Sequence, residues 1–502
     1  MGADSIALSR QTATAGVWTI GARLVAKGVD FASLIVLARF LGPGDFGLVA
    51  MAMTLIFIIE AVFELPLWSA LTRVPDPTPR MYGTAFTLSA LRGLAIGVIL
   101  ASASWPMAHF YNEPRLIPLV IALAMAPILR GLMSARMVQF ARQMDFRRQA
   151  FLDVTSKVIA GTAAVTLAVL TKSYWSIALG TILTPTVLMV GSYILAPMRP
   201  RLTLKDWPLF ADMVSWNVLS QILLAVNWQI GRFILPRFVD TVSFGRYAMA
   251  NDLAAIPTQV LVSPLGFPLN VAFVTSNERG DLKNTYLKAM GAIAILMFPI
   301  YSFMGLVSRP LIDLFLGSKW EGAAFLLSGL ALSSFIQAAA APMPPLAISL
   351  NQSRLITFRS LTQCLVLVPL VIAGVWLFGV PGAIFAVCVE ACLIMFMTML
   401  TVRLLVAASI REQITALAGP VAISAIAGTM LYCATLFIVI GGNPLLLALQ
   451  IAVVGLFYLA VYAGGIYLIS RWVKSTAGAE QMIISIGLNT LAKFRRSASG
   501  NK

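Results

Sequence analysis

Charged side chains inside long apolar stretches are the residues of this sequence most able to do chemistry. In the first such stretch Arg23, Lys27 and Asp30 follow one another at spacings of four and three residues, which puts them on one stripe of a helix. Arg92 and Arg232 each interrupt another apolar stretch. A charge at the centre of a membrane costs about 2.5–3.5 kcal/mol on insertion scales, so it is usually kept for function. The excess of cations predicts attraction of an anion, and arginine suits a phosphate group because it donates two parallel hydrogen bonds.

Uncharged polar residues add groups that could hydrogen-bond or stack on a sugar. Three of them share a helix face with Arg232, and two more occur in the next apolar stretch. The predicted substrate-binding residues are therefore Arg23, Lys27, Arg92, Arg232, Asn217, Gln221, Trp228, Asn251 and Gln259. Carboxylates inside apolar stretches can take up a proton or a sodium ion. The predicted ion-coupling residues are Asp30, Asp252 and Glu390.

Several charges also have a structural interpretation, as partners that neutralise one another. The spacing permits three pairings, which are Asp153 with Lys157, Lys27 with Asp30, and Glu60 or Glu64 with Arg73 or Arg80. Arg92 and Arg232 have no opposite charge on their own helices, so a binding role is favoured for both of them.

The elements that must position these residues are membrane-spanning helices. The chain is 59% hydrophobic and 11% charged, and its mean hydropathy is +0.88. Soluble domains carry about 25% charged residues, and a helical span needs about 20 apolar residues. We predict an all-α integral membrane protein with fourteen spans, near residues 15–38, 46–70, 82–106, 115–135, 151–171, 175–197, 213–236, 244–266, 289–308, 323–350, 356–378, 382–404, 416–440 and 445–470.

Basic residues in the connecting loops predict the orientation. Alternate loops are rich in arginine and lysine, as in the segment from Arg136 to Arg148, whereas the loops between them are short and carry few charges. By the positive-inside rule both termini are cytoplasmic. We expect a bacterial inner-membrane protein, and the net charge of +16 is explained by orientation and not by nucleic-acid binding.

An internal repeat divides the chain. At an offset of 198 residues Trp18 matches Trp216, and Phe46-Gly47 matches Phe244-Gly245, without a gap over about 50 residues. Six spans separate the copies, so both have the same orientation, which is typical of transporters with parallel repeats. The predicted parts are a cytoplasmic segment 1–14, an N-lobe of six spans 15–197, a C-lobe of six spans 213–404, two further spans 416–470 and a basic cytoplasmic tail 471–502.

Motifs of enzymes and ATPases are missing from the sequence. There is no GxxxxGK[ST] phosphate loop, HExxH motif or nucleophile elbow. The single histidine, His109, and the four cysteines occur without metal-ligand spacing. We therefore expect no enzymatic activity, no metal and no cofactor beyond a proton or sodium gradient.

The segment 37–47, LARFLGPGDFG, resembles the first hairpin of Wzx-type polysaccharide flippases, which belong to the multidrug/oligosaccharidyl-lipid/polysaccharide exporter superfamily. The stretches 244–250 and 316–320 are similar to the same family. The chain departs from it at 263–266, which lacks an arginine common in relatives, and at 351–354, which lacks a glycine. These departures concern specificity and not fold.

The resemblance implies a flippase of undecaprenyl-diphosphate-linked oligosaccharide repeat units, serving exopolysaccharide, capsule or O-antigen (lipopolysaccharide) synthesis. It implies two six-helix lobes around a cavity, with the lipid-linked sugar and membrane lipids as ligands. A polysaccharide polymerase and a chain-length regulator are the candidate protein partners. Two alternatives stay open, namely a multidrug antiporter of the same superfamily and a peptidoglycan-precursor flippase.

Overall fold

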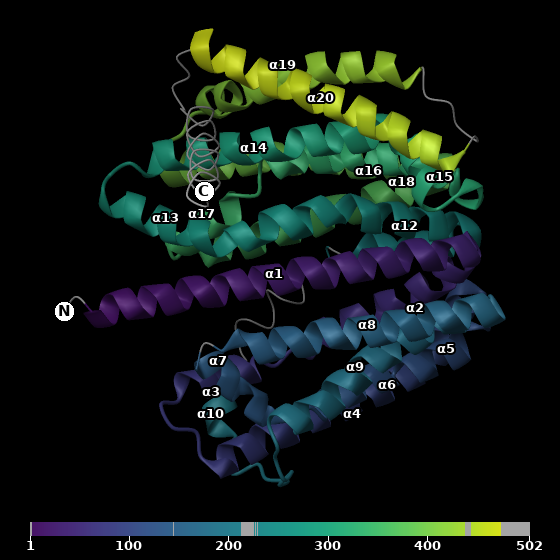
Figure 1. Ribbon diagram of the computed structural model, residues 1–502, viewed down its shortest axis with the longest axis vertical. Helices are drawn as coiled ribbons and strands as arrows, with labels where there is room; N and C mark the ends of the chain where they lie inside the picture. Colours follow the sequence, from purple (N-terminus) through teal and green to yellow (C-terminus); the bar gives the residue numbers. More distant parts are fainter. Residues whose placement is uncertain are drawn as a thin grey trace, which may run out of the picture. The chain divides into compact units, whose positions relative to one another are not determined.

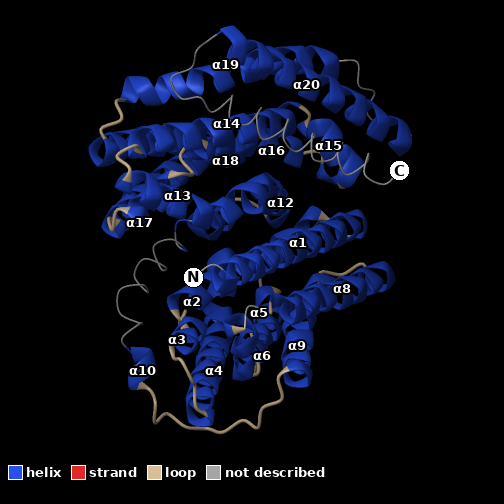
Figure 2. Ribbon diagram, turned by 60° about the vertical axis from the view of Figure 1, so that its left-hand side comes forward, coloured by secondary structure: helices blue, strands red, loops and turns tan. Residues whose placement is uncertain are grey.

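The computed structural model describes residues 3–143, 145–211, 225, 227, 229–436 and 443–472. In these residues every regular element is a helix, and none is a strand (Figure 2). The prediction of an all-α integral membrane protein is thereby confirmed. The predicted site residues Asn217, Gln221 and Trp228 lie outside the described residues.

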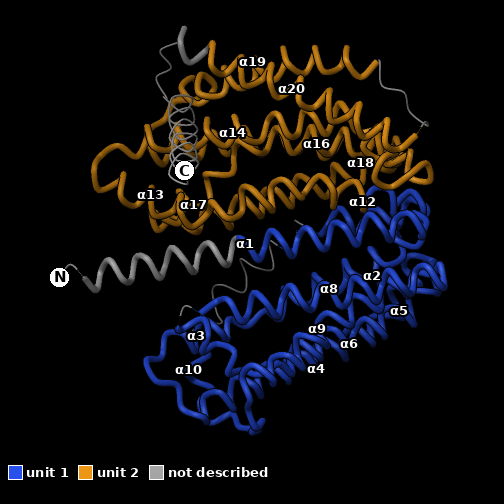
Figure 3. The backbone as a smooth tube through the Cα atoms, viewed as in Figure 1, with its two compact units in different colours: residues 1–248 blue, residues 249–502 orange. Residues whose placement is uncertain are grey.

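The chain forms two compact units, residues 1–248 and 249–502 (Figure 3). The boundary between the units falls inside one helix, Thr241–Pro257. The predicted boundary between the lobes, at 197–213, adjoins residues that the structure does not describe. The division into lobes, terminal spans and tail therefore stays a prediction.

Unit 1 is a bundle of apolar helices with short connections (Figure 1). Within it α8 packs against α1 and α9, and α4 packs against α5 and α6. Its elements are α1 (Ala3–Phe40), α2 (Pro43–Val62), α3 (Leu67–Arg73), α4 (Pro79–Tyr111), α5 (Leu116–Leu123), α6 (Met125–Gly131), η1 (Ala135–Met137), α7 (Val138–Arg142), α8 (Phe146–Thr171), α9 (Trp175–Leu195), α10 (Pro208–Ala211), η2 (Leu235–Arg237) and the first half of α12 (Thr241–Pro257).

Unit 2 packs around α14, which contacts both α16 and α19. Aromatic and methionine side chains such as Phe298, Tyr301 and Met343 fill its main core. Its further elements are η3 (Thr258–Val262), η4 (Ser263–Leu265), α13 (Gly266–Glu278), α14 (Leu282–Leu306), α15 (Ser308–Phe315), η5 (Ser318–Trp320), α16 (Ala323–Ala338), α17 (Met343–Ser349), α18 (Ser353–Val406), α19 (Ile410–Thr435) and α20 (Pro444–Trp472).

The number of spans depends on how long and broken helices are divided. Among the described residues ten helices are long and apolar enough to cross a membrane, or eleven if a bent pair around Ser134 is one span. One of the ten, α18, has 54 residues and contains a reversal at Gly379, whose φ of 63° favours glycine. There the backbones at Gly374 and Gly382 touch, so α18 is a hairpin with the length of two spans. The count of fourteen stays a prediction.

The two copies of the repeat begin alike. Helix α12 starts at Thr241, which is 198 residues after the start of α2 at Pro43. The glycines of the repeated Phe-Gly pairs, Gly47 and Gly245, lie against one another. A Cβ on Gly245 would stand 1.8 Å from the Pro43 carbonyl oxygen, so only glycine allows α2 and the start of α12 to come this close.

Hydrogen bonds of Glu113, in the turn between α4 and α5, reach the start of α12. The Glu113 carboxylate accepts from Arg115 Nε at 2.7 Å and from Thr241 Oγ1 at 3.4 Å. The Arg115 guanidinium thereby holds the pKa of Glu113 below its usual range. The turn between α4 and α5 is in this way joined to the first residue of α12.

Candidate functional site

The charged cluster of unit 1 is built from α2, α4 and α6. Arg130 Nη1 donates to both carboxylate oxygens of Glu60, at 2.6 and 2.7 Å. Arg92 Nη2 donates to the backbone carbonyl oxygen of Glu60 at 3.3 Å. Arg92 also lies within electrostatic range of Glu64. Two guanidinium groups and two carboxylates therefore share one region, although α4 itself carries no carboxylate beside Arg92.

Close helix packing brings the two arginines together. Each is followed by a glycine, and Gly93 of α4 lies against Gly131 of α6. A Cβ on Gly93 would stand 2.6 Å from the Pro127 carbonyl oxygen, and one on Gly131 would stand 2.5 Å from that of Ser89. The absence of both side chains lets the helices approach, so the preceding Arg92 and Arg130 are held on neighbouring backbones.

Arg130 is the member of this cluster that a ligand could reach from outside. Its side chain is 41% exposed, against 16% for that of Glu60. Only its Nη1 is hydrogen-bonded within the described part of the chain, so Nη2 and Nε can still donate. The Arg92 Nε is buried and has no acceptor among the described residues. An anion that displaced the Glu60 carboxylate would find several donors.

The charges of α1 face α8. Lys157 forms an ion pair with Asp30, and Asp153 lies in the field of both Lys157 and Arg23. The Ser33 Oγ would lie 2.4 Å from a Cβ on Gly161, so the two helices are in close contact there. The predicted stripe of α1 therefore belongs to an interhelical charge network, and the ion pair of Lys157 is made with Asp30 and not within α8.

The predicted pairing of Glu60 with Arg73 or Arg80 is wrong. Glu60 binds Arg130, and Arg80 binds Asp206, with an Nη2–Oδ1 distance of 2.8 Å. Spacing along the chain suggested the nearest arginines, but Arg130 is 70 residues away from Glu60. The partner is decided by which helices pack together, and the spacing of residues along the chain does not show this.

Arg232 lies in unit 1, whereas the predicted polar residues Asn251, Asp252 and Gln259 lie in unit 2. Arg232 Nη2 donates to the Ala248 carbonyl oxygen at 2.9 Å. Asn251 is half-buried on α12, whereas Asp252 is exposed. Gln259 lies in the π-helical turn η3, directly after Pro257. This turn is joined to α14 by a hydrogen bond of 2.5 Å between Thr258 Oγ1 and Tyr301 Oη.

Unit 2 buries one of the predicted ion-coupling residues. Glu390, on the second half of α18, is 2% exposed. Its Oε1 accepts from Gln363 Nε2 at 2.6 Å, and its Oε2 accepts from Gln337 Nε2 at 3.4 Å. Arg359, one turn before Gln363, donates to Thr398 Oγ1 at 3.2 Å and lies in the field of Glu390. Both carboxylate oxygens are therefore held by side-chain amides.

Four residues of these sites are absent from the sequence-based prediction. They are Arg130, Gln337, Arg359 and Gln363. Two signals were available in the sequence. Arg130 precedes a glycine just as Arg92 does, and Arg359 stands four residues before Gln363, which places both on one helix face.

Comparisons with known proteins agree with the resemblance seen in the sequence. A family model described as polysaccharide biosynthesis protein matches residues 36–325. The succinoglycan biosynthesis transport protein ExoT of Rhizobium meliloti is 24% identical over 66% of this chain and 67% of its own. The lipopolysaccharide biosynthesis protein WzxC of Escherichia coli is 21% identical over 75% of this chain and 78% of its own.

A solved structure shares the fold. The lipid II flippase MurJ in an inward closed conformation superimposes with a TM-score of 0.72 at 13% sequence identity. The match covers 92% of this chain and 100% of that one. The likeness extends over almost the whole length, and at this identity it shows the fold alone.

Proposed function

Because the chain belongs to the polysaccharide biosynthesis protein family, we propose that it is a flippase for undecaprenyl-diphosphate-linked oligosaccharide repeat units. It moves them across the bacterial inner membrane for exopolysaccharide, capsule or O-antigen synthesis, with both termini in the cytoplasm. The relatives ExoT, a succinoglycan biosynthesis transport protein, and WzxC, a lipopolysaccharide biosynthesis protein, support a role in the transport of polysaccharide precursors. Its action is binding and conformational change, without a covalent step.

The observation that carries the proposal is the guanidinium pair Arg92–Arg130. A diphosphate is a polyanion, and arginine binds phosphate through parallel charge-assisted hydrogen bonds. The Glu60 carboxylate accepts a hydrogen bond from Arg130 Nη1. A diphosphate has to displace Glu60 from Arg130 in order to bind. This competition lowers the net affinity, so the diphosphate can also be released, as a carrier requires.

The other predicted site residues take supporting roles in this proposal. Arg232 supplies a further cation, and Asn251 and Gln259 donate to sugar hydroxyls, as would Asn217 and Gln221, while the ring of Trp228 would stack on a sugar. Glu390, held between two amides, takes up the proton or sodium ion that drives the cycle. Asp30 is the less favoured coupling residue since it is engaged by Lys157.

The test is complementation of a deletion strain with Arg92→Gln and Arg130→Gln. Each loss of a charge-assisted contact is expected to lower polymer export about tenfold to a hundredfold. Lipid-linked repeat units should accumulate in the cytoplasmic leaflet, while immunoblots show normal protein levels. Arg115→Gln is the matched control, since Arg115 is also paired to a glutamate but lies outside the spans.

The result also separates the alternatives. Full export by both variants would contradict the guanidinium-pair site. A deletion strain with drug sensitivity and intact polymer would indicate the multidrug antiporter. Loss of viability with accumulated peptidoglycan precursor would indicate a precursor flippase.

A further inference from the structure

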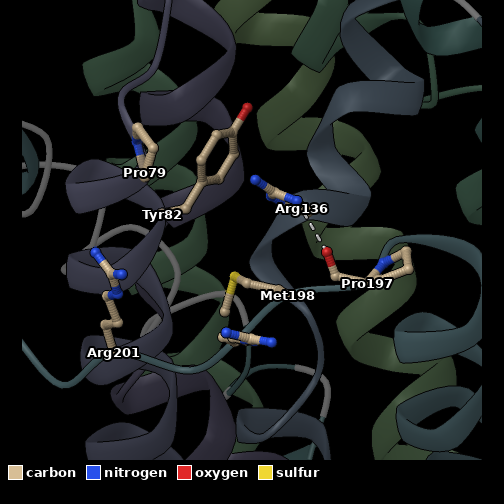
Figure 4. A pocket seen from close by; sticks show the side chains of 7 residues that line it. Pro79, Tyr82, Arg136, Pro197, Met198 and Arg201 are labelled. Carbon is tan, nitrogen blue, oxygen red and sulfur yellow. Dashed lines mark hydrogen bonds between the residues drawn. The ribbon is translucent and has the colours of Figure 1, made fainter.

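A cavity of about 520 Å³ opens at one end of the helices of unit 1. None of the residues of the transport site described above lines it. It is formed by the first turn of α4, by η1 and by the segment that follows α9 (Figure 4). Its lining residues are Pro79, Tyr82, Arg136, Pro197, Met198, Arg199 and Arg201.

The cavity is strongly basic. Three of its seven lining residues are arginines, Arg136, Arg199 and Arg201. Arg136 Nη1 donates to the Pro197 carbonyl oxygen at 2.9 Å. Within the described ranges no carboxylate forms an ion pair with any of the three, whereas the neighbouring Arg80 is paired with Asp206. Guanidinium groups gathered without a counter-charge indicate a site for an anion.

The wall of the cavity is fixed on the side of η1. Ser134 Oγ donates to the Ala196 carbonyl oxygen at 2.7 Å, and the Ser134 N–H donates to Ser192 Oγ at 3.0 Å. Together with the bond from Arg136 to Pro197, these contacts hold the chain where it leaves α9. The cavity therefore needs little rearrangement to receive a ligand.

The opposite side of the wall is fixed to α4. The Thr203 N–H donates to the buried Thr87 Oγ1 at 3.0 Å. A Cβ on Gly83 would stand 2.9 Å from the Arg201 carbonyl oxygen, so this segment lies directly against the helix. Asp206 then pairs with Arg80 at 2.8 Å. Arg199 and Arg201 are thus carried on a segment that is tied down before and after them.

The same segment has the pattern of a membrane interface. It lies outside the candidate spans, and its apolar side chains are exposed, with Leu202 at 79%, Leu204 at 49% and Trp207 at 42%. Arg201 and Lys205 flank the two leucines, and Asp206 precedes Trp207. Basic residues interleaved with leucine and tryptophan favour the boundary between acyl chains and lipid phosphates.

We propose that this cavity binds the phosphate of an anionic phospholipid headgroup in the leaflet that faces the arginine-rich loops. Its volume accommodates a glycerophosphate group, its three arginines supply the donors, and the exposed leucines and Trp207 lie where acyl chains begin. A basic pocket of this kind at the cytoplasmic side of helices is suited to anionic lipids. The site is distinct from the guanidinium pair Arg92–Arg130 and does not depend on what the protein transports.

Native mass spectrometry of the purified full-length protein tests this site. With equal amounts of dioleoyl phosphatidylglycerol and dioleoyl phosphatidylcholine, the wild type should retain phosphatidylglycerol preferentially. Removing two of the arginines in Arg199→Gln/Arg201→Gln should lower that retention about tenfold. The control Arg73→Gln/Arg279→Gln removes the same charge from exposed arginines that neither line the cavity nor belong to this segment, and it should stay within about twofold of the wild type.

Three results would overturn the proposal. They are no preference for phosphatidylglycerol in the wild type, equal loss in the pocket variant and the control, and replacement of the bound phosphatidylglycerol by undecaprenyl diphosphate at lower concentration. The last would assign the cavity to a polyprenyl lipid.

A second measurement does not need the pocket variant to fold. Brominated phosphatidylglycerol should quench the Trp207 fluorescence, taken as the difference between wild type and Trp207→Phe, more strongly than brominated phosphatidylcholine. Equal quenching by the two lipids would contradict the proposal.

Discussion

The two units treat charges inside the membrane in different ways. Unit 1 pairs opposite charges between helices, as in Arg130 with Glu60 and Lys157 with Asp30. Unit 2 buries the single carboxylate of Glu390 and surrounds it with the amides of Gln337 and Gln363. An ion pair can exchange its anion for another anion. A carboxylate held by neutral amides can instead change its own charge.

This difference suggests a division of roles under the proposed function. The arginines of unit 1 are suited to the diphosphate, since they keep their charge at every physiological pH. Glu390 is suited to the coupling ion, since amide donors hold the carboxylate without neutralising it. The comparison can be tested by removing the central group of each arrangement.

Glu390→Ala should have the largest effect on stability. It leaves the amide N–H groups of Gln337 and Gln363 without their acceptor and leaves Arg359 without a facing charge. Breaking such a buried arrangement costs about 3–5 kcal/mol, which thermal denaturation of the detergent-purified protein would register as a large fall in Tm. Glu60→Ala in unit 1 should cost less, because its partner Arg130 is 41% exposed and can turn to water.

The conservative variant Glu390→Gln separates stability from coupling. It keeps one carbonyl acceptor, so we expect most of the stability to return while dependence of transport on the ion gradient is lost. Equal Tm values for Glu390→Ala and Glu60→Ala would show that the two units hold their carboxylates equally firmly, and the comparison would fail.

Gly131→Ala, a change in unit 1, should have an intermediate effect on stability. The added Cβ would stand 2.5 Å from the Ser89 carbonyl oxygen, so α6 has to move away from α4. Overpacking of this kind costs about 1–3 kcal/mol, and the separation of Arg92 from Arg130 should lower export further. Tm and polymer export are the measurements.

Gly28→Ala is the control for that substitution. Nothing lies within 4 Å of a Cβ at Gly28, and alanine is about 1 kcal/mol more favourable than glycine in a helix interior. We expect unchanged export and an equal or higher Tm. If Gly131→Ala behaves in the same way, close packing of α4 and α6 is not what holds the arginines together.

Long apolar helices such as α4 and α8 could be predicted from the sequence because bilayer thickness dictates the length of apolar stretches. The repeat was equally readable, since Thr241 opens α12 at the offset that the Phe-Gly pairs give. Polar residues inside spans, such as Arg92 and Glu390, could be singled out because apolar surroundings make them costly.

The partners of those residues could not be predicted. Arg130 and Glu60 are 70 residues apart, and Lys157 and Asp30 are 127 apart. Their pairing depends on which helix faces pack, and that is decided by small residues such as Gly93 and Gly161 together with the shapes around them. Arg359 was missed because it stands near the start of its predicted span, where a charge is expected at the lipid headgroups.

Removing the ion pair of Lys157 with Asp30 should have the smallest effect on stability. Their side chains are 28% and 43% exposed, so each single variant, Lys157→Gln or Asp30→Asn, should cost about 1 kcal/mol or less. The double variant should lose less than the sum of the two, since each single change already removes the pair. A double-mutant cycle from thermal denaturation measures this coupling. Additive losses would mean that the two residues act independently, and α1 would then be bound to α8 by packing at Gly161 and not by charge.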